Sequence, residues 1–316
     1  PGVLAVVAEP FWPRVSPHFV ECRRAVRPFD EPALIGLSGG PDSLSLVAAA
    51  AAEGKDVRAF VVDHGLQEGS TEAGRRAVAA AQGLGVPAEV IPVEVGAAPG
   101  ESVEAVAREA RYAALAAAAN RDGREIWVAH TREDQAETLL LGALRGNPAG
   151  MAAVTALDSG VRLVRPFLTI RRADTVGACR ELSLAPWHDP MNEELAYRRV
   201  SIRHSIIPAL TELIGGDAVP ALARAADRIA ADQELIASLV DLSPTNDCAV
   251  LATEPAPVRQ RRIMAWLRGH GVGVSGAQLA AVEQLCTEWR GQGPVAIGGG
   301  LQVERRGGEL NVDKQA

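Results

Sequence analysis

The chain has 316 residues, of which 47% are hydrophobic and 22% charged, and its formal net charge is −7. This balance excludes a disordered polypeptide, and no run of about 18 apolar residues could span a bilayer, so we expect no membrane segment. The cysteines form no C-x-x-C pair, which excludes the common zinc, iron–sulfur and redox-dithiol motifs and favours a reducing, cytoplasmic compartment; they are Cys22, Cys179, Cys248 and Cys286.

Apolar runs alternate with helical patterns from residue 33 onward. Buried strands are predicted at 33–37, 57–62, 88–93 and 125–129. Helices are predicted after them, at 43–52, 71–83, 102–119 and 133–144. This alternation predicts an α/β domain with a doubly wound parallel sheet covered on both faces, whose ligands bind beyond the carboxyl ends of the strands.

The pattern changes after the Gly215-Gly216 pair. Helices are predicted at 218–239 and 258–268, followed by a glycine-broken tail, 291–300, and short strands. These features predict a second, smaller, mainly helical domain that ends in a hairpin. We therefore expect an α/β catalytic domain over 1–215 and a small domain over 216–316, in agreement with roughly 100 to 200 residues per domain.

Two segments reverse the acidic balance of the whole chain. Residues 162–203 carry eight arginines against five acids, and residues 255–268 carry four arginines and no acid. Such faces could bind a phosphate-rich partner despite the net negative charge. Solvated arginines on helix surfaces are the alternative interpretation, and the sequence leaves both open.

The segment 38–43 reads S-G-G-P-D-S and lies where the first strand turns into the first helix. Its glycines allow the backbone to approach a ligand, Pro41 suits the first helical position, and the free N–H groups form an anion site. The hydroxyls of Ser38 and Ser43 could add hydrogen bonds to phosphate oxygens. The segment therefore predicts a phosphate-binding loop.

Asp42 is the unusual member of this loop, because a carboxylate repels phosphate unless a cation lies between them. It therefore implies Mg²⁺. The chain contains neither a Walker P-loop nor a G-x-G-x-x-G dinucleotide motif. A plain strand-to-helix turn, with Asp42 at the positive end of the helix dipole, is the alternative.

Further charged residues follow the fourth strand. Thr131 and Asp134 have the form of a capping box, and Asp134 and Glu137 lie three residues apart on the first turn of the next helix. Together with Asp42, these carboxylates should converge on Mg²⁺ or on a cationic substrate, although capping alone would also account for Asp134. Arg199 and Arg203 could grip phosphate bidentately, or could be solvated at a helix start.

The S-G-G-x-D-S loop resembles the pyrophosphate loop of the ATP-pyrophosphatase superfamily, which cleaves ATP between its α and β phosphates. Later motifs, in order between about residues 33 and 210, resemble the tRNA(Ile)-lysidine synthetase family. They are D-H-G-L at 63–66, E-A-V-A-R-E-A-R-Y at 104–112, A-H-T-R-E-D-Q-A-E-T at 129–138, R-G at 145–146, R-P at 165–166, W-H-D-P-M-N at 187–192 and I-R-H at 202–204. The tail is similar to the shorter members, which carry one small domain after the catalytic one.

The resemblance implies a ligase that uses ATP and Mg²⁺ to join L-lysine to C2 of the wobble cytidine of tRNA(Ile) with a CAU anticodon. An adenylated tRNA would be the intermediate, and the product lysidine would change decoding from AUG to AUA. The resemblance is also compatible with a homodimer. Another ATP-pyrophosphatase, such as a tRNA thiolase or a small-molecule synthetase, and a non-catalytic ATP-binding module are the alternatives.

The expected site residues fall into four groups. For catalysis we expect Asp42, Asp134, Glu137 and Arg199. For ATP we expect Ser38, Gly39, Gly40, Pro41, Asp42, Ser43, Asp63, His64, Arg108, Arg111 and His130. For tRNA we expect Arg145, Arg199, Arg203, Arg261 and Arg262, and for Mg²⁺ we expect Asp42 and Asp134. The sequence departs from the family pattern in four places, which bear on details of the tRNA and lysine sites: Gln67, Met191, Val200 and the N-P-A-G loop at 147–150.

Overall fold

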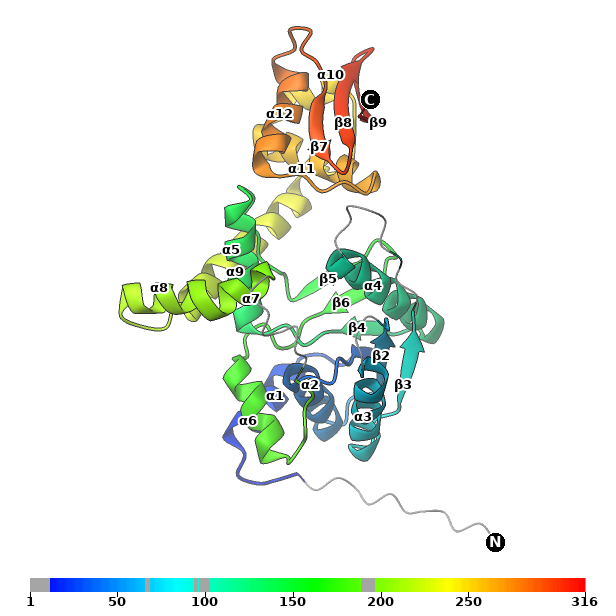
Figure 1. Cartoon of the computed structure of the whole chain (residues 1–316), viewed down its shortest axis with the longest axis vertical. Coiled ribbons are helices and arrows are strands. Elements are labelled where there is room, and N and C mark those ends of the chain that lie inside the picture. The colour runs from blue at the N-terminus through cyan, green and yellow to red at the C-terminus, as the bar shows by residue number, and fades with distance from the viewer. Residues whose placement is uncertain (1–11, 66–68, 94–95, 97–102, 189–196, 316) are drawn as a thin grey trace. The chain divides into compact units, whose positions relative to one another are not determined.

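The computed structural model describes residues 12–65, 69–93, 96, 103–188 and 197–315 (Figure 1). The chain forms two compact units. Unit 1 comprises the chain up to Glu137 together with Met151–Ala225, and unit 2 comprises Thr138–Gly150 together with Ala226–Ala316. The boundary at 215/216 expected from the sequence stays a prediction, and each unit is described separately below.

Unit 1 is built on a six-stranded sheet of order β3-β2-β1-β4-β6-β5. All neighbouring strands pair in parallel except β5 with β6, which confirms the predicted parallel α/β sheet. The strand order reverses between β1 and β4, and this switch point is where doubly wound folds bind their ligands. The strands are β1 (Ala33–Gly36), β2 (Val57–Asp63), β3 (Ala88–Pro92), β4 (Glu125–Trp127), β5 (Val154–Ala156) and β6 (Arg162–Val164).

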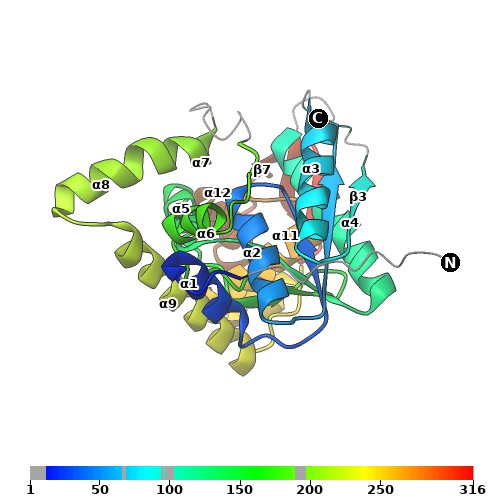
Figure 2. The same ribbon diagram turned by 90° about the horizontal axis from the view of Figure 1, so that it is seen from below.

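Alternate side chains of the central strands enter two separate cores. Ala33 and Ile35 pack with helices α1 (Pro17–Val26), α2 (Pro41–Ala52), α3 (Ser70–Gly83) and α6 (Arg172–Glu181). Leu34 faces the opposite side, where α4 (Val103–Asp122) covers the sheet. This period of two explains why the strand is apolar throughout. Helices α1, α2 and α6 pack against one another, as Figure 2 shows.

Two further helical runs belong to this part of the chain. Helix α5 (Arg132–Leu144) follows β4, with residues 132–137 in unit 1 and the rest in unit 2. The second run consists of α7 (Arg198–Ser201), a π-helical turn (Ile202–Ile206) and α8 (Ile207–Ile214), and it leads to α9 (Val219–Leu239). A π-helical turn is uncommon and is often found at functional sites.

Besides the end of α5 and most of α9, the described part of unit 2 contains the helices α10 to α12 and an antiparallel sheet. The helices α10 (Cys248–Thr253), α11 (Ala256–Gly269) and α12 (Gly276–Thr287) share a core with the sheet, which includes Leu251, Ile263, Val282, Leu285, Val303 and Leu310. The sheet has three strands in the order β7-β8-β9: Val295–Gly298, Leu301–Arg306 and Glu309–Lys314. The predicted hairpin is therefore incomplete, because β7 was hidden in the glycine-rich tail. Its glycines form the tight turn to β8, with positive φ at Gly298, Gly299 and Gly300.

The segment after α5 joins the second unit through the backbone. The N–H of Gly276, at the start of α12, donates to the carbonyl of Arg145 at 2.8 Å. Within the described residues, no single helix is long and apolar enough to cross a membrane. One bent pair, Arg198–Ile214 with Val219–Leu239, reaches the required length and composition only when both parts are counted together.

Candidate active site

The loop between β1 and α2 has the geometry expected of a phosphate cradle. Gly39 has φ +82°, a conformation that favours glycine, and a Cβ there would also make a tight contact of 3.2 Å with Ala77 Cβ. The hydroxyl of Ser43 is 3.1 Å from that of Ser38 and accepts the Ser38 N–H at 3.2 Å. Gly40 caps α2 and Pro41 is its first residue. The two serines thus fix the shape of the loop as well as lining it.

Asp42 is held by two residues of α6. Its carboxylate accepts hydrogen bonds from Thr175 Oγ1 and, at 3.3 Å, from Arg172 Nε. Burial raises the pKa of Asp42, and although Arg172 and Thr175 oppose this effect, the pKa stays above its ordinary value. Asp42 therefore lies in the loop as predicted, but with a partner inside the chain.

Asp134 caps α5, as the capping-box pattern indicated, and also pairs with Arg172. Its Oδ2 caps α5 by accepting the Thr131 N–H at 2.7 Å and the Thr131 hydroxyl at 2.8 Å. Its Oδ1 lies 3.0 Å from Arg172 Nη2. Burial raises the pKa of Asp134, but the charge of Arg172 and the bonds from Thr131 outweigh burial and lower the pKa to about 2. Asp134 is therefore a firmly ionised carboxylate.

Glu137 is completely buried and contacts three arginines. Arg203 Nε lies 2.8 Å from Oε1, Arg199 Nη1 lies 3.7 Å from Oε2, and Arg172 Nη1 lies 3.6 Å from Oε1. Three carboxylates and three guanidiniums thus form one group of balanced formal charge, which we call the carboxylate–arginine cluster: Asp42, Asp134, Glu137, Arg172, Arg199 and Arg203. The carboxylates converge as predicted, but they need no external cation for charge balance.

Arg172 is the member of this cluster that the sequence analysis missed. It follows Arg171 in an arginine-rich stretch, and no local pattern indicates which of the two points inward. The structure separates them: Arg171 pairs with Glu133 at 2.7 Å and with Asp217, whereas Arg172 reaches the cluster. The R-R pair itself was the available signal, and it does not show which of the two arginines enters the cluster.

Asp63, at the end of β2, stabilises the turn that leads into α3. Its carboxylate accepts from the Thr71 hydroxyl at 2.7 Å, the Ser70 hydroxyl at 2.9 Å and the Gly65 N–H at 3.0 Å. The hydrogen bond from Thr71 lowers its pKa most, although burial opposes the shift. His64 follows directly. The structure thus gives Asp63 an organising role at the carboxyl end of β2.

His130 lies among positive charges beyond β4. Burial is the largest cause of its lowered pKa, about 4, and the charges of Arg108, Arg165 and Arg199 add to the effect. Arg108 stacks on Tyr112 with 5.0 Å between the guanidinium carbon and the ring centroid, and Arg111 lies on the same helix. Because His130 is neutral at pH 7, it can accept or donate one hydrogen bond per ring nitrogen without adding charge.

The candidate arginines of unit 2 differ in their partners. Arg262 pairs with Glu254 and donates through Nε to the carbonyl of Ser243 at 2.8 Å. Arg261 donates to the carbonyl of Pro257 at 2.7 Å, and among the described residues no acid lies within 4.0 Å of it. Arg145 is exposed on the segment after α5.

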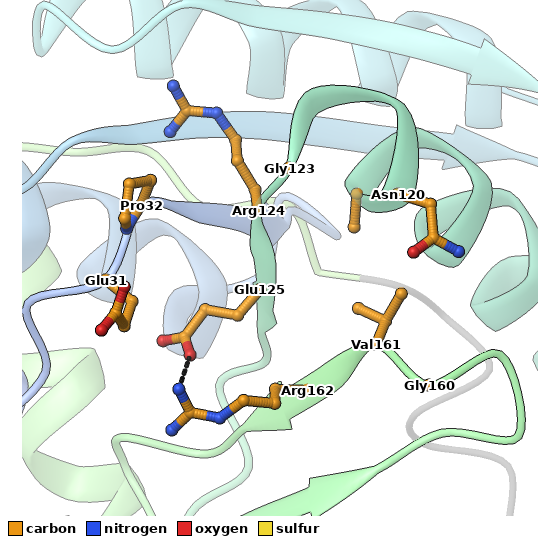
Figure 3. A pocket seen from close by; sticks show the side chains of 10 residues that line it. Glu31, Pro32, Asn120, Gly123, Arg124, Glu125, Gly160, Val161 and Arg162 are labelled. Atoms are coloured by element: carbon orange, nitrogen blue, oxygen red, sulfur yellow. Dashed lines mark ion pairs between the residues drawn. The ribbon is translucent and has the colours of Figure 1, made fainter.

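A hollow of about 290 Å³ lies at the opposite edge of the unit 1 sheet (Figure 3). Its lining residues lie near the end of α4 and at or just before the starts of β1, β4 and β6. They include Arg162, whose Nη1 lies 3.2 Å from Glu125 Oε2. Trp127 Nε1 donates to the other oxygen of Glu125 at 2.6 Å. None of the expected site residues lines this hollow, and it lies at the amino ends of the strands, so the candidate site remains at the switch point.

Some expected features fall outside the described residues. Gln67 and Met191, and the end of the W-H-D-P-M-N stretch, are among them. Val200 is described and is a buried residue of α7. An apolar side chain in that position packs inside the protein, where an asparagine would need a hydrogen-bond partner.

Two family models match the chain. A PP-loop domain matches residues 20–210, and a TilS substrate binding domain matches residues 247–310. The tRNA(Ile)-lysidine synthase of Corynebacterium glutamicum is 50% identical over 309 residues, which cover 95% of this chain and 96% of that protein. The enzyme of the same name from Rhodococcus jostii is 41% identical over 94% of this chain and 96% of its own length.

A solved structure shows a related fold. The U34-tRNA thiolase NcsA from Methanococcus maripaludis, described with its [4Fe-4S] cluster, superimposes with a TM-score of 0.57 over 77% of this chain and 87% of its own, at 16% sequence identity. That likeness concerns the fold alone. The phosphate loop at the switch point, the domain matches and the extent of sequence identity together show that the chain belongs to the tRNA(Ile)-lysidine synthase family.

Proposed function

We propose that this protein is an ATP-dependent ligase that forms lysidine on tRNA(Ile) by joining L-lysine to the wobble cytidine of the CAU anticodon. The observation that carries this function is the phosphate loop of residues 38–43 at the switch point, beside the carboxylate–arginine cluster, in a chain related to lysidine synthases over both of its units. The relatives are named for this reaction, and the chain spans almost their whole length.

The reaction would proceed in two steps. The C2 oxygen of cytidine attacks the α-phosphorus of ATP, an oxygen–phosphorus bond forms, and pyrophosphate leaves. The side-chain ammonium of lysine first gives a proton to water, and the resulting amine attacks C2. The bond from C2 to oxygen breaks, AMP leaves, and the new C–N nitrogen releases its second proton to water. Adenylation makes the second step easier, because AMP is a far better leaving group than an amide-like oxygen.

ATP binding follows from the PP-loop domain, and we assign its phosphates to the loop of residues 38–43 and the start of α2. Asp42 and Asp134 provide hard oxygen donors suited to Mg²⁺, which commonly takes one or two carboxylates together with phosphate oxygens. Both carboxylates also contact Arg172, so a bound metal and the Arg172 guanidinium would share them as partners. When bound, Mg²⁺ would neutralise charge on the leaving pyrophosphate.

Asp134 and Glu137 would have different roles toward lysine. A pKa of about 2 makes Asp134 a weak base, so it is suited to orient the ammonium group through Oδ1 and not to remove its proton. Glu137 is enclosed by Arg172, Arg199 and Arg203. We therefore assign Glu137 the task of holding Arg199 and Arg203 beside the phosphate loop.

Binding of tRNA would use arginines of both units. Arg145 and Arg261 are the best candidates for phosphate contacts, because the described residues provide no acid partner for either. Arg199, Arg203 and Arg262 stay candidates, although each is paired with an acid in the structure. The cytoplasmic location and the homodimer also stay predictions.

The nearest alternative is a different reaction on the same fold. The similar thiolase is described with an iron–sulfur cluster, and the four cysteines of this chain are free and buried, two in each unit: Cys22, Cys179, Cys248 and Cys286. Thiolation would require reactive or metal-bound thiolates, and burial raises the pKa of Cys179 to about 12. This environment favours the ligase.

The decisive experiment is AMP release from ATP with and without lysine and unmodified tRNA(Ile). We expect release of free AMP to require both, and mass spectrometry to show lysine on the tRNA. The variant Asp42→Asn should lower the rate by roughly 100-fold or more while keeping the fold. Arg24→Gln, which removes an exposed pair with Glu21 on α1, serves as the control and should keep full activity. Lysine-independent AMP release, or an unchanged rate in Asp42→Asn, would reject the proposal.

A further inference from the structure

The guanidinium of Arg172 lies between the three carboxylates of the cluster. Its Nε is 3.3 Å from Asp42, its Nη2 is 3.0 Å from Asp134, and its Nη1 is 3.6 Å from Glu137. Asp42 belongs to α2, the other two acids belong to α5, and Arg172 is the first residue of α6. One side chain therefore joins the turns that follow β1 and β4 on either side of the switch point.

The position of Arg172 is set by contacts that do not involve its own guanidinium. Its backbone N–H donates to Glu133 at 2.9 Å, and Thr175, one turn further along α6, donates to Asp42. Arg171 reinforces the same helix start through Glu133 and Asp217. Replacing the guanidinium should therefore leave α6 in place and remove mainly its charge.

The acids of the cluster depend on Arg172 to different degrees. Glu137 has two further arginine partners, and Asp134 has Arg203 at 3.8 Å. Asp42 has one: among the described residues, Arg172 is its single cationic partner within 4.0 Å. The side chains of Asp42 and Asp134 are only 24% and 13% exposed. Two poorly solvated carboxylates near each other are strongly unfavourable when their shared cation is removed.

We propose that Arg172 is a positioning residue that acts as an internal counter-cation and holds the Asp42 and Asp134 carboxylates together at the nucleotide site when no divalent cation is bound. The planar guanidinium suits this role, because its three nitrogens can reach three acids at once, which the single ammonium of lysine cannot do. What the carboxylates do in catalysis rests on the proposed function, whereas the electrostatic role of Arg172 does not.

The test is a thermal denaturation of Arg172→Gln with and without MgCl₂ at constant ionic strength. Without Mg²⁺, the variant should melt lower than the parent protein by roughly 5 °C or more, since it leaves two carboxylates uncompensated. Added Mg²⁺ should restore most of this loss, because it replaces the missing charge, and should change the parent protein much less. Arg171→Gln is the matched control: it loses ion pairs on the same helix start and should show no recovery with Mg²⁺.

A second variant separates charge from structure. In Arg172→Gln with Asp42→Asn, the uncompensated charge is gone, so the melting temperature should recover by more than half and no longer respond to Mg²⁺. If Arg172→Gln is unfolded without Mg²⁺, this double variant should fold. A loss that Mg²⁺ does not reverse, an additive loss in the double variant, or an equal Mg²⁺ response in Arg171→Gln would each overturn the proposal. The assay contains no ATP, lysine or tRNA, so its outcome is independent of the proposed function.

Discussion

The two arginine-rich segments of the chain place most of the arginines compared here beside acids, but they differ in how those acids are shared. In unit 1, Arg199 and Arg203 both contact the buried carboxylate of Glu137. In unit 2, helix α11 divides its arginines: Arg259 and Arg262 pair with acids and are 13% and 12% exposed, whereas Arg261 has a backbone carbonyl as partner. A local excess of arginine therefore does not define a free basic surface, because acids distant in sequence decide which charges remain available.

The largest effect should come from the segment of unit 1. Arg203→Gln removes the closest partner of a fully buried carboxylate, and we expect it to lower the free energy of unfolding by about 3 kcal/mol. Urea denaturation measures this loss. Adding Glu137→Gln should restore part of the stability, because the buried charge is then neutral. Equal stability of Arg203→Gln and the parent protein would show that Arg172 and Arg199 are enough to compensate the buried charge of Glu137.

A smaller loss is expected in unit 2, where adjacent residues of α11 provide a matched pair. Arg262→Gln should cost about 2 kcal/mol, since it removes the bonds to Glu254 and to the carbonyl of Ser243. Arg261→Gln should cost less than about 0.5 kcal/mol. Urea denaturation of both variants checks the difference, and similar losses would remove the distinction between the two positions.

The effects of Arg261→Gln and Arg262→Gln on tRNA binding should have the reverse order of their effects on stability. If Arg261 contacts a phosphate, Arg261→Gln should reduce the slope of log affinity against log salt concentration by about one unit. Arg262→Gln, whose charge is already paired, should leave that slope almost unchanged. Filter binding of tRNA(Ile) over a range of salt concentrations measures both, and an unchanged slope in Arg261→Gln would exclude it from the RNA contact.

The remaining comparison concerns the pH dependence of His130, whose pKa is lowered first by burial and further by the charges of the unit 1 arginines. Its pKa is about 4 in the folded protein, below the ordinary value of 6.5, so the unfolded chain binds its proton first as the pH falls. His130 therefore contributes stability above pH 6.5 that is lost between pH 6.5 and 4. The difference in unfolding free energy between the parent protein and His130→Asn should shrink over this interval. In Arg199→Gln, NMR titration should show the pKa of His130 moved upward.

Local features of the sequence explain what could be predicted. The central strands were recognisable because they are apolar on both faces, and the loop of residues 38–43 because its glycines, Pro41 and serines each satisfy a backbone requirement of that turn. The three-residue strands β5 and β6 were missed, since so short a run has no distinguishable period. The strand β7 was missed because glycines obscure it.

The sequence by itself determined four strands of the parallel sheet, the phosphate loop, the cap at Asp134 and the family resemblance, because all of these depend on residues close together in the chain or in a fixed order. Only the tertiary structure decided that Arg172, and not Arg171, enters the site, and that Glu137 has arginine partners. The residues of these pairs are far apart in sequence: Asp42 and Arg172 are 130 positions apart, and Glu137 and Arg203 are 66. The attraction between opposite charges depends on their distance in space and not on their separation along the chain. The packing of α2, α5, α6 and α7 around the switch point therefore determines which residues pair.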